Sequence, residues 1–290
     1  MTKDEFQKLV QQGPVILDGA TGSNLRAMGM PVGVSSEVWV MEHPEVITKL
    51  QRDYQSAGSQ IIYAPTFQAN RICMKGHGKA DQVPELNHRL VEISRTALGE
   101  NFLIGGDLST VGQMLEPMGY LSYEEVYAAY QEQIALLAEA GVDLLVAETM
   151  MSEDETVACL DAALSVTELP FLCSFSVQAD GSLLYGGSVY DAAQTLEGMG
   201  ASAVGINCSC GPDQLVSVIA HLRELVEIPI IAKPNAGLPE IDDLGQAHYS
   251  MGPDAFAEHM KALVDAGASL VGGCCGTTPE YIRKLCEAIR

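Results

Sequence analysis

The stretch EAGVDLLVA, residues 139–147, joins the end of a predicted helix to a short apolar run. The same form recurs as SAGSQIIYA at 56–64, GMGASAVGI at 198–206 and DAGASLVGG at 265–273. In each copy a glycine follows the helix end, where the left-handed backbone favours that residue. The recurring turn predicts that helices and strands alternate along the chain.

Eight short apolar runs extend this pattern over the whole chain. They are near-continuous rather than alternating, as in parallel strands that are covered on both faces. The predicted strands are Val15–Ala20, Ile61–Thr66, Phe102–Leu108, Leu144–Glu148, Phe171–Val177, Ala203–Asn207, Pro229–Lys233 and Leu270–Gly273. The segments between them have helical spacing of apolar residues, most clearly at Tyr123–Ala140, and also at Pro84–Leu98, Glu153–Leu164, Pro212–Val226, Pro253–Asp265 and Pro279–Ile289.

Eight strand–helix units predict an α/β fold, a single (β/α)8 TIM barrel that spans residues 1–290 as one domain. The alternative is a doubly wound open sheet. It is less favoured because no G-x-G-x-x-G follows the first strand and no change of composition marks a second domain.

Composition limits the classes of partner. The formal net charge is −22, which disfavours direct contact with nucleic acid or anionic lipid. The sequence contains no apolar run of the roughly 18 residues that a membrane span needs, and its first residues do not resemble a signal peptide. We therefore expect a cytoplasmic protein with reduced thiols, in which four isolated cysteines fill the core: Cys73, Cys159, Cys173 and Cys286.

Three other cysteines fall at predicted strand ends, where catalytic groups of such barrels gather. Cys208 ends the sixth strand, and Cys274 and Cys275 follow the eighth. Neighbouring Cα atoms lie about 3.8 Å apart, too close for a relaxed disulfide, which needs roughly 4.4–6.8 Å. Three thiolates could instead hold Zn²⁺ with a fourth position open, as in catalytic zinc sites. The alternative is three small residues in tight turns. Cys210 is a possible fourth ligand, but positions i and i+2 at a strand end tend to diverge.

The chemistry of such a site follows from its charge. Three thiolates leave the complex negative, which makes the metal a weak activator of water. It still lowers the pKa of an incoming thiol below the usual value of about 8.5 and leaves the sulfur nucleophilic. The site therefore predicts alkyl transfer to a substrate thiol, with Cys208, Cys274 and Cys275 as its catalytic metal ligands.

Other polar residues at strand ends are candidates for substrate binding. Glu148 and Asp18 each close an apolar run, and a buried carboxylate there needs a cation. A substrate ammonium or a structural Lys or Arg would serve equally well. The glycines after Asp18 could expose backbone N–H groups to a substrate carboxylate. Asn235 in KPNAG is a further candidate, although asparagine also suits a turn.

Six motifs carry a resemblance to a known family. LDGATGSNL, PTFQAN, VAETM, GINCSCGPDQL, KPNAGLP and VGGCCGTTPEYI resemble, in order and spacing, those of the zinc-dependent homocysteine S-methyltransferases. The chain looks most like the homocysteine-binding barrel of that family's cobalamin-dependent members. The resemblance implies a barrel in which Cys208, Cys274 and Cys275 hold zinc and homocysteine sulfur takes the open position. It further implies that Glu148 holds the amino group, that Asp18 with the Gly19–Ala20 backbone fixes the amino-acid end, and that Thr66 lines the pocket.

The resemblance does not decide which compound donates the methyl group. The chain contains no D-x-H-x-x-G corrinoid motif, so methylcobalamin would have to arrive on a separate corrinoid protein. Such a partner could even be required for any activity. Betaine and S-methylmethionine are alternatives, but one tryptophan and few other aromatic residues offer no obvious cage for a quaternary ammonium. A different class of function, zinc storage or redox sensing, would also use a cysteine cluster.

Overall fold

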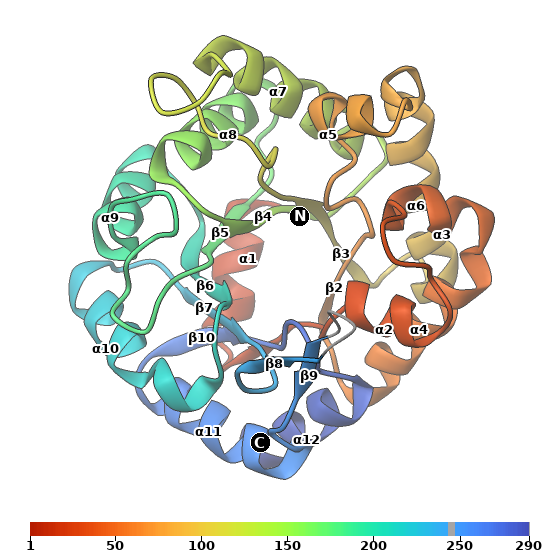
Figure 1. Ribbon diagram of the computed structural model, residues 1–290. Helices are drawn as coiled ribbons and strands as arrows, with labels where there is room; N and C mark the ends of the chain where they lie inside the picture. Colours follow the sequence, from red (N-terminus) through yellow and green to blue (C-terminus); the bar gives the residue numbers. More distant parts are fainter. Residues whose placement is uncertain (243–246, 290) are drawn as a thin grey trace.

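Eight parallel strands form a nearly closed barrel in the computed structural model, which describes residues 1–242 and 247–289 (Figure 1). The strand order confirms the predicted (β/α)8 barrel, and each predicted run overlaps one strand. Around the barrel the strands are β1 (Val15–Ile16), β10 (Ala268–Val271), β7 (Ile230–Pro234), β6 (Ala203–Cys208), β5 (Phe171–Phe175), β4 (Leu144–Met150), β3 (Leu103–Leu108) and β2 (Ile61–Tyr63).

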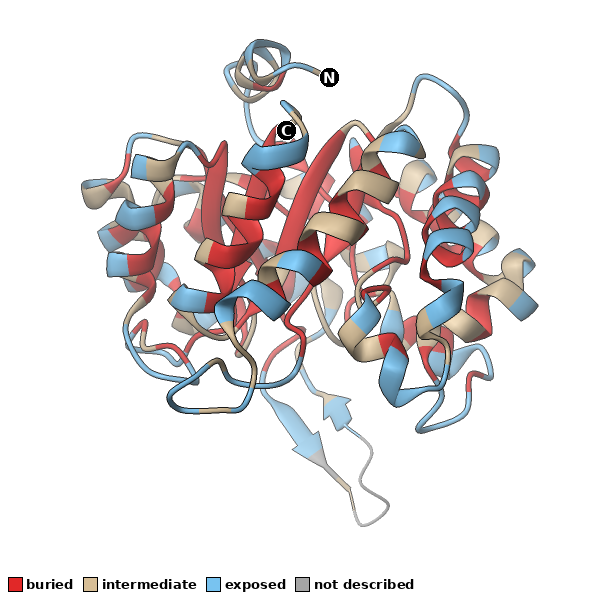
Figure 2. Ribbon diagram, turned by 90° about the horizontal axis from the view of Figure 1, so that it is seen from above, coloured by how far each residue is buried: buried red, intermediate tan, exposed pale blue. Residues whose placement is uncertain are grey.

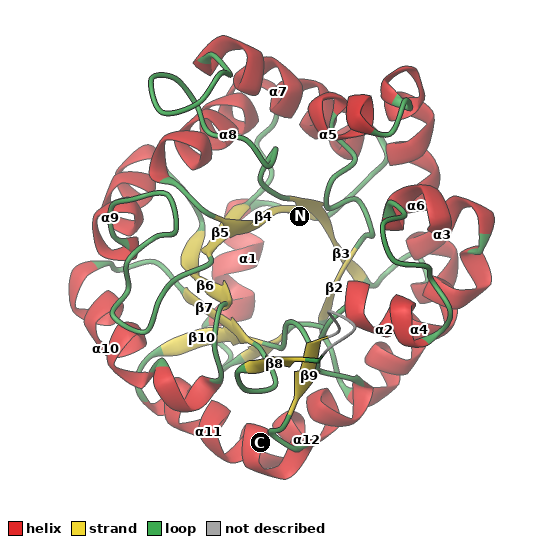
Figure 3. Cartoon of the chain, viewed as in Figure 1, coloured by secondary structure: helices red, strands yellow, loops and turns green. Residues whose placement is uncertain are grey.

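Helices surround this barrel (Figure 3). They are α4 (Pro44–Ala57), α6 (Val83–Leu98), α7 (Tyr123–Glu139), α8 (Glu153–Val166), α9 (Val189–Met199), α10 (Val216–Leu225), α11 (Pro253–Asp265) and α12 (Pro279–Ile289). Short helices lie in the connections: α2 (Gly22–Ala27), α3 (Ser36–Glu42), α5 (Arg71–Gly76), η1 (Ala80–Gln82) and η2 (Pro212–Gln214). The helix predicted at Pro212–Val226 is thus divided into η2 and α10.

Local sequence explains where several helices begin. Ser122, Ser152 and Ser188 precede α7, α8 and α9, and each hydroxyl accepts a hydrogen bond from the backbone N–H three residues later. These bonds satisfy N–H groups that have no partner within the first turn of a helix. At the other end, Gly58 and Gly200 take the left-handed conformation after α4 and α9.

The seam between β1 and β2 is bridged without a regular strand ladder. The Gln60 backbone N–H donates to the Ile16 carbonyl at 2.7 Å, and the Ile16 N–H donates to Gln60 Oε1 at 2.9 Å. Ser59 Oγ adds a bond to the Leu17 carbonyl at 3.0 Å. Side chains therefore satisfy backbone groups that would otherwise be exposed at two sheet edges.

An N-terminal helix that was not predicted, α1 (Lys3–Val10), closes the N-terminal end of the barrel. In Figures 1 and 3 it is visible through the centre of the barrel. Its Phe6 is fully buried and belongs to the same cluster as the inward-facing side chains of the strands. Burying such an aromatic side chain stabilises the fold by roughly 1.5–3 kcal/mol.

Buried residues lie along the strands and on the helices around them (Figure 2), and the apolar ones form two clusters. The larger lies between the strands and the helices. The smaller fills the barrel interior with Phe6, Val15, Leu17, Ile61, Tyr63, Leu144, Val146, Leu172, Ala203, Ile231 and Leu270. Interior residues of one strand are two positions apart, as the alternation of side chains along a strand requires.

A short antiparallel hairpin follows β7 and was not predicted. It pairs β8 (Pro239–Ile241) with β9 (Ala247–Tyr249) and projects from the barrel end opposite α1 (Figure 2). Within the described part of the chain, no helix has the length and apolarity needed to cross a membrane.

Candidate functional site

The site is the polar continuation of the barrel interior. One step of two residues beyond Val146 and Ile231 leads to Glu148 on β4 and Lys233 on β7. The same step from Leu103, taken twice, leads to Asp107 on β3. Because side chains two apart on a strand share a face, these groups point into the C-terminal mouth. All three line one cavity of about 440 Å³.

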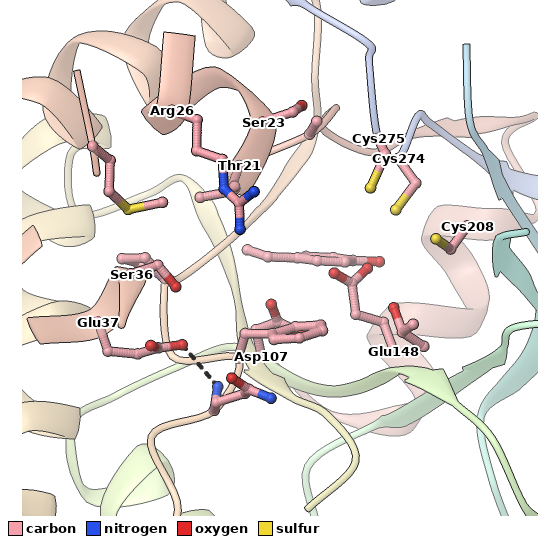
Figure 4. Close-up of a pocket in the computed structure, with 18 of the residues that line it drawn as sticks. Thr21, Ser23, Arg26, Ser36, Glu37, Asp107, Glu148, Cys208, Cys274 and Cys275 are labelled. Carbon is pink, nitrogen blue, oxygen red and sulfur yellow. Dashed lines mark hydrogen bonds between the residues drawn. The ribbon is translucent and has the colours of Figure 1, made fainter. Parts of the chain in front are cut away.

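Cys208, Cys274 and Cys275 converge at one side of that cavity (Figure 4). Their sulfur atoms all lie within 4.8 Å of one another. Tetrahedral zinc with Zn–S bonds of about 2.3 Å would place its sulfur ligands roughly 3.8 Å apart. The set of three thiolates is also of the soft kind that zinc favours. The residues therefore fit a zinc ion.

The backbone around the cysteines is held from both sides. Cys274 N–H donates to the Pro234 carbonyl at 2.8 Å, and Ala236 N–H donates to the Cys275 carbonyl at 3.0 Å. Gly276 has φ +82°, and a Cβ there would come within 2.5 Å of the Tyr249 ring. Both the conformation and the close contact explain why glycine follows the cysteine pair.

Cys208 itself has a left-handed backbone, with φ 58°, and Ser209 follows with φ 69°. Residues other than glycine adopt this conformation at a cost of order 1–3 kcal/mol, most often at functional sites. Here it turns the chain at the end of β6. The Cys208 side chain consequently lines both the 440 Å³ cavity and a second cavity of about 460 Å³.

Hydrogen bonds among the three thiols shift the pKa values of Cys274 and Cys275 in opposite directions. Bonds from Cys208 and Cys274, with a further bond from the Tyr249 phenol, lower the pKa of Cys275 to about 3. The pKa of Cys274 is raised, first by its hydrogen bond to Cys208 and then by that to Cys275. The cluster thus favours a thiolate at Cys275. Tyr249 was missed in the sequence analysis because the hairpin that carries it was not predicted.

Thr277 connects the cysteine loop to the loop after β1. Its Oγ1 accepts from Ala20 N–H at 3.1 Å and donates to the Cys274 carbonyl at 2.7 Å. The Asn24 amide donates to both the Ala20 and the Thr277 carbonyls, at 2.7 and 2.8 Å. The Ala20 N–H of the expected Gly19–Ala20 nest is therefore already used within the protein.

Gly19 is required by close packing. A Cβ at this position would lie 2.6 Å from the Tyr54 hydroxyl and 2.9 Å from Thr277 Oγ1. The Tyr54 hydroxyl in turn donates to the Ala20 carbonyl at 2.8 Å. Gly19 and Ala20 line the cavity together with Asp18.

Lys233 is the buried cation between the two predicted carboxylates. Its Nζ lies 2.7 Å from Asp18 Oδ1 and 3.4 Å from Glu148 Oε2, and its side chain is 3% exposed. It also lies 3.8 Å from the centre of the Tyr63 ring, a cation–π contact. Although burial lowers the pKa of Lys233, the charges of Asp18 and Glu148 raise it well above its usual value. Of the two predicted partners for these carboxylates, a substrate ammonium or a structural Lys or Arg, the structure contains the second, Lys233.

Two carboxyl groups in the cavity are incompletely compensated. Burial raises the pKa of Glu148, and the Lys233 ammonium lowers it only in part. Burial and the nearby Glu148 charge raise the pKa of Asp107 well above its usual range. Asp107 Oδ1 is buried and has no hydrogen-bond partner in the described chain. Asp107 was not singled out from the sequence.

Asn207 fixes the strand end that carries Glu148. Its Oδ1 accepts from Thr149 N–H at 2.7 Å and from Ser174 Oγ at 2.9 Å, and its Nδ2 donates to Thr149 Oγ1 at 2.7 Å. Thr149 has φ 61°, so these bonds hold a strained turn directly after Glu148.

Two predicted substrate-binding residues lie outside the described lining of the 440 Å³ cavity. Thr66 is buried, and its hydroxyl donates to the Asp107 carbonyl at 2.8 Å and accepts from the Asp107 N–H at 3.1 Å. Asn235 lines the second cavity, where Nδ2 donates to the Ser209 carbonyl at 3.3 Å and Oδ1 has no partner among the described residues. Cys210 is buried beside it, outside the three-sulfur cluster.

The chain matches one family profile and is similar to known proteins. A family profile described as homocysteine S-methyltransferase matches residues 15–289. The methionine synthases of Mycobacterium leprae and Mycobacterium tuberculosis are 29% and 28% identical over 98% and 97% of this chain. The matched region is 25% of the length of each of these two relatives.

Solved structures agree with this result. The oxidized form of the homocysteine methyltransferase MmuM from Escherichia coli aligns with a TM-score of 0.80 and 26% identity, covering 94% of this chain and 95% of that one. Its metallated form aligns with a TM-score of 0.79 and 25% identity, covering 96% and 97%. The carboxyl transferase domain of Rhizobium etli pyruvate carboxylase is similar in fold, with a TM-score of 0.56 and 14% identity over 99% of this chain and 49% of that one.

Proposed function

Because the chain belongs to the homocysteine S-methyltransferase family, we propose that it transfers a methyl group to the sulfur of homocysteine and forms methionine. In this proposal residues 1–290 make up one homocysteine-binding barrel domain. The observation that carries it is the meeting of three cysteine sulfurs, within 4.8 Å of one another, at the side of a cavity that also contains carboxylates.

Cys208, Cys274 and Cys275 would hold zinc, and zinc when bound supplies a lowered thiol pKa and hence an ionised acceptor sulfur. The other residues bind and orient the acceptor. Glu148 attracts its ammonium group, and the cavity of about 440 Å³ has room for an amino acid of this size. Because Thr277 links the Cys274 carbonyl to the Ala20 N–H, the cysteine loop and the wall of the acceptor cavity are held together.

For the donor we favour a protein-bound methyl-corrinoid. Several large apolar side chains are exposed in loops that follow barrel strands, including Val32 after β1, Tyr120 after β3 and Leu238 after β7. A protein or domain that docks at this end of the barrel would cover these side chains. A quaternary ammonium donor would instead need a cage of aromatic faces. Of the aromatic rings that line the described cavity, Tyr63 already faces Lys233.

The test uses reduced, zinc-loaded protein with homocysteine and one methyl-labelled donor at a time: free methylcobalamin, a methyl-corrinoid protein, S-methylmethionine or betaine. We expect labelled methionine with the corrinoid donors and none after a chelator has removed the metal. Methionine from S-methylmethionine or betaine alone would replace the donor assignment. Several labile zinc ions per chain, without homocysteine binding, would contradict the enzyme and favour zinc storage.

A further inference from the structure

Three carboxyl side chains and one ammonium group line the acceptor cavity. Asp18, Asp107, Glu148 and Lys233 all line it and all are largely buried. Lys233 can compensate only one of the three carboxylates completely. Since an uncompensated buried carboxylate is costly, the arrangement leaves room for one more positive charge.

Asp18 is already satisfied within the protein. Its Oδ1 accepts from Lys233 Nζ at 2.7 Å, and its Oδ2 accepts from Tyr63 N–H at 2.8 Å. Lys233 is thereby fixed against Asp18 and the Tyr63 ring, with Glu148 at the longer distance of 3.4 Å. Lys233 thus occupies the position between Asp18 and Glu148 that an acceptor ammonium would otherwise take.

The carboxyl group of Asp107, unlike that of Asp18, has an oxygen without a hydrogen-bond partner among the described residues. Asp107 is 5% exposed, and the oxygen is Oδ1. The hydrogen bonds between Asp107 and Thr66 use the backbone of Asp107 rather than its carboxyl group. β3 and β4 are neighbours in the barrel, so Asp107 and Glu148 extend into the cavity from adjacent strands. Asp107 thus lines the cavity with a carboxyl group whose Oδ1 lacks a partner among the described residues, and movement of this side chain could bring that oxygen to a ligand.

We propose that Asp107 and Glu148 together receive the ammonium group of the acceptor, while Lys233 is the permanent counter-ion of Asp18. This inference rests on the proposed function, which supplies the amino-acid thiol, and it adds a specificity-determining residue to that site. The cavity then selects thiols that carry one ammonium group. A thiol of the same length without that group leaves the two carboxylates facing each other.

The experiment compares two ligands that differ only in this group. Homocysteine and 4-mercaptobutyrate are titrated calorimetrically into reduced, zinc-loaded wild type and Asp107→Asn. A hydrogen-bonded charge pair contributes about 1.5–3 kcal/mol, so wild type is expected to prefer homocysteine by about 10- to 100-fold. Asp107→Asn is expected to remove at least about tenfold of that preference and to change 4-mercaptobutyrate affinity less than about twofold.

Stability provides the second measurement and the control. Because the Asp107 carboxyl has no partner at Oδ1 among the described residues, the ligand-free Asp107→Asn protein should have a Tm at or above that of wild type. Glu155 is a control outside the described lining of the cavity, a buried carboxylate that accepts from Thr110 Oγ1 at 2.8 Å and from Val111 N–H at 2.6 Å. Glu155→Gln should lower Tm and leave the ratio of the two affinities unchanged.

The possible results test the ammonium subsite separately from the proposed function. Equal affinity of wild type for both ligands, or an unchanged preference in Asp107→Asn, would overturn the ammonium subsite while homocysteine binding upholds the proposed function. Tighter binding of 4-mercaptobutyrate would mean that Lys233 has replaced the acceptor ammonium, which also overturns it. If neither ligand binds, the proposed function fails and takes this inference with it.

Discussion

Replacing Lys233 by methionine should destabilise the protein strongly. The substitution keeps an unbranched side chain of similar length but removes the charge that lies 2.7 Å from Asp18 and 3.4 Å from Glu148. Removing one partner of a buried ion pair costs about 3–5 kcal/mol, because the other charge stays buried without compensation. We expect a loss of that size at pH 8, since the backbone N–H of Tyr63 would then be the remaining donor to the Asp18 carboxylate among the described residues.

The loss should depend on pH in a definite direction. Burial already raises the pKa of Glu148 above its usual value, and without the Lys233 ammonium nothing on β7 opposes that effect. A group whose pKa is raised by folding contributes stability below the unfolded value, and this contribution is lost as the pH rises through the folded value. The deficit of Lys233→Met relative to wild type should therefore be largest at pH 8 and smaller near pH 5.

The assay is urea unfolding of reduced, metal-free protein, followed by circular dichroism, for wild type, Lys233→Met, Asp18→Asn and the double variant. The carboxamide introduced by Asp18→Asn can still accept from Tyr63 N–H through its oxygen, so the double variant should be more stable than Lys233→Met alone. The reasoning is refuted if Lys233→Met loses less than about 1 kcal/mol at pH 8. It is refuted equally if the losses of the two single variants simply add.

Three further variants test the site. Cys274→Ser should lose zinc and activity together but keep the fold, as shown by elemental analysis and circular dichroism; a full complement of zinc would make the ligand assignment wrong. Glu148→Gln should weaken homocysteine binding by about 10- to 100-fold in calorimetry at unchanged zinc content, and loss of zinc would contradict its role in binding. Thr277→Val should lose about 2–4 kcal/mol of stability in urea, because Ala20 N–H and the Cys274 carbonyl each lose a buried partner. Thr277→Ser keeps the hydroxyl and should be close to wild type, so similar losses in both variants would exclude these hydrogen bonds as the cause.

The barrel could be predicted because its units repeat. The glycine turn at 139–147 and its three relatives mark strand starts that the structure contains at β4, β2, β6 and β10. Proline at the first helical position placed α11 and α12 with the observed bounds, Pro253–Asp265 and Pro279–Ile289. The glycine turns and the helix-starting prolines are short sequence patterns, so they are sufficient to predict where these strands and helices begin.

Other elements depend on contacts that no local pattern contains. α1 has a capping box at Thr2 and Glu5, yet its place beneath the barrel follows from the buried Phe6 and from Met1, Leu9 and Val10, which pack against the same interior cluster. The hairpin β8–β9 is too short for a clear alternation of apolar and polar residues. Tyr249 reaches the cysteines only because this hairpin forms.

Within the site, residue types at strand ends identified the cysteines, Glu148 and Asp18, but not their partners. Lys233 and Asp107 were present in the quoted motifs or runs and were passed over. A period of two, counted from interior residues such as Ile231 and Leu103, would have placed both on the inner face. The distances that make Lys233 a counter-ion of Asp18 come from barrel closure, which a single strand does not specify.

The helix beneath the barrel limits how small molecules can enter and leave the site. With Phe6 filling the floor, a small molecule reaches the cysteines of the described structure from the strand ends at the opposite side. Under the proposed function, the acceptor would enter and the methylated product would leave through this same opening. The product would then have to leave before the next acceptor binds, so a high product concentration should slow the proposed reaction by occupying the acceptor site.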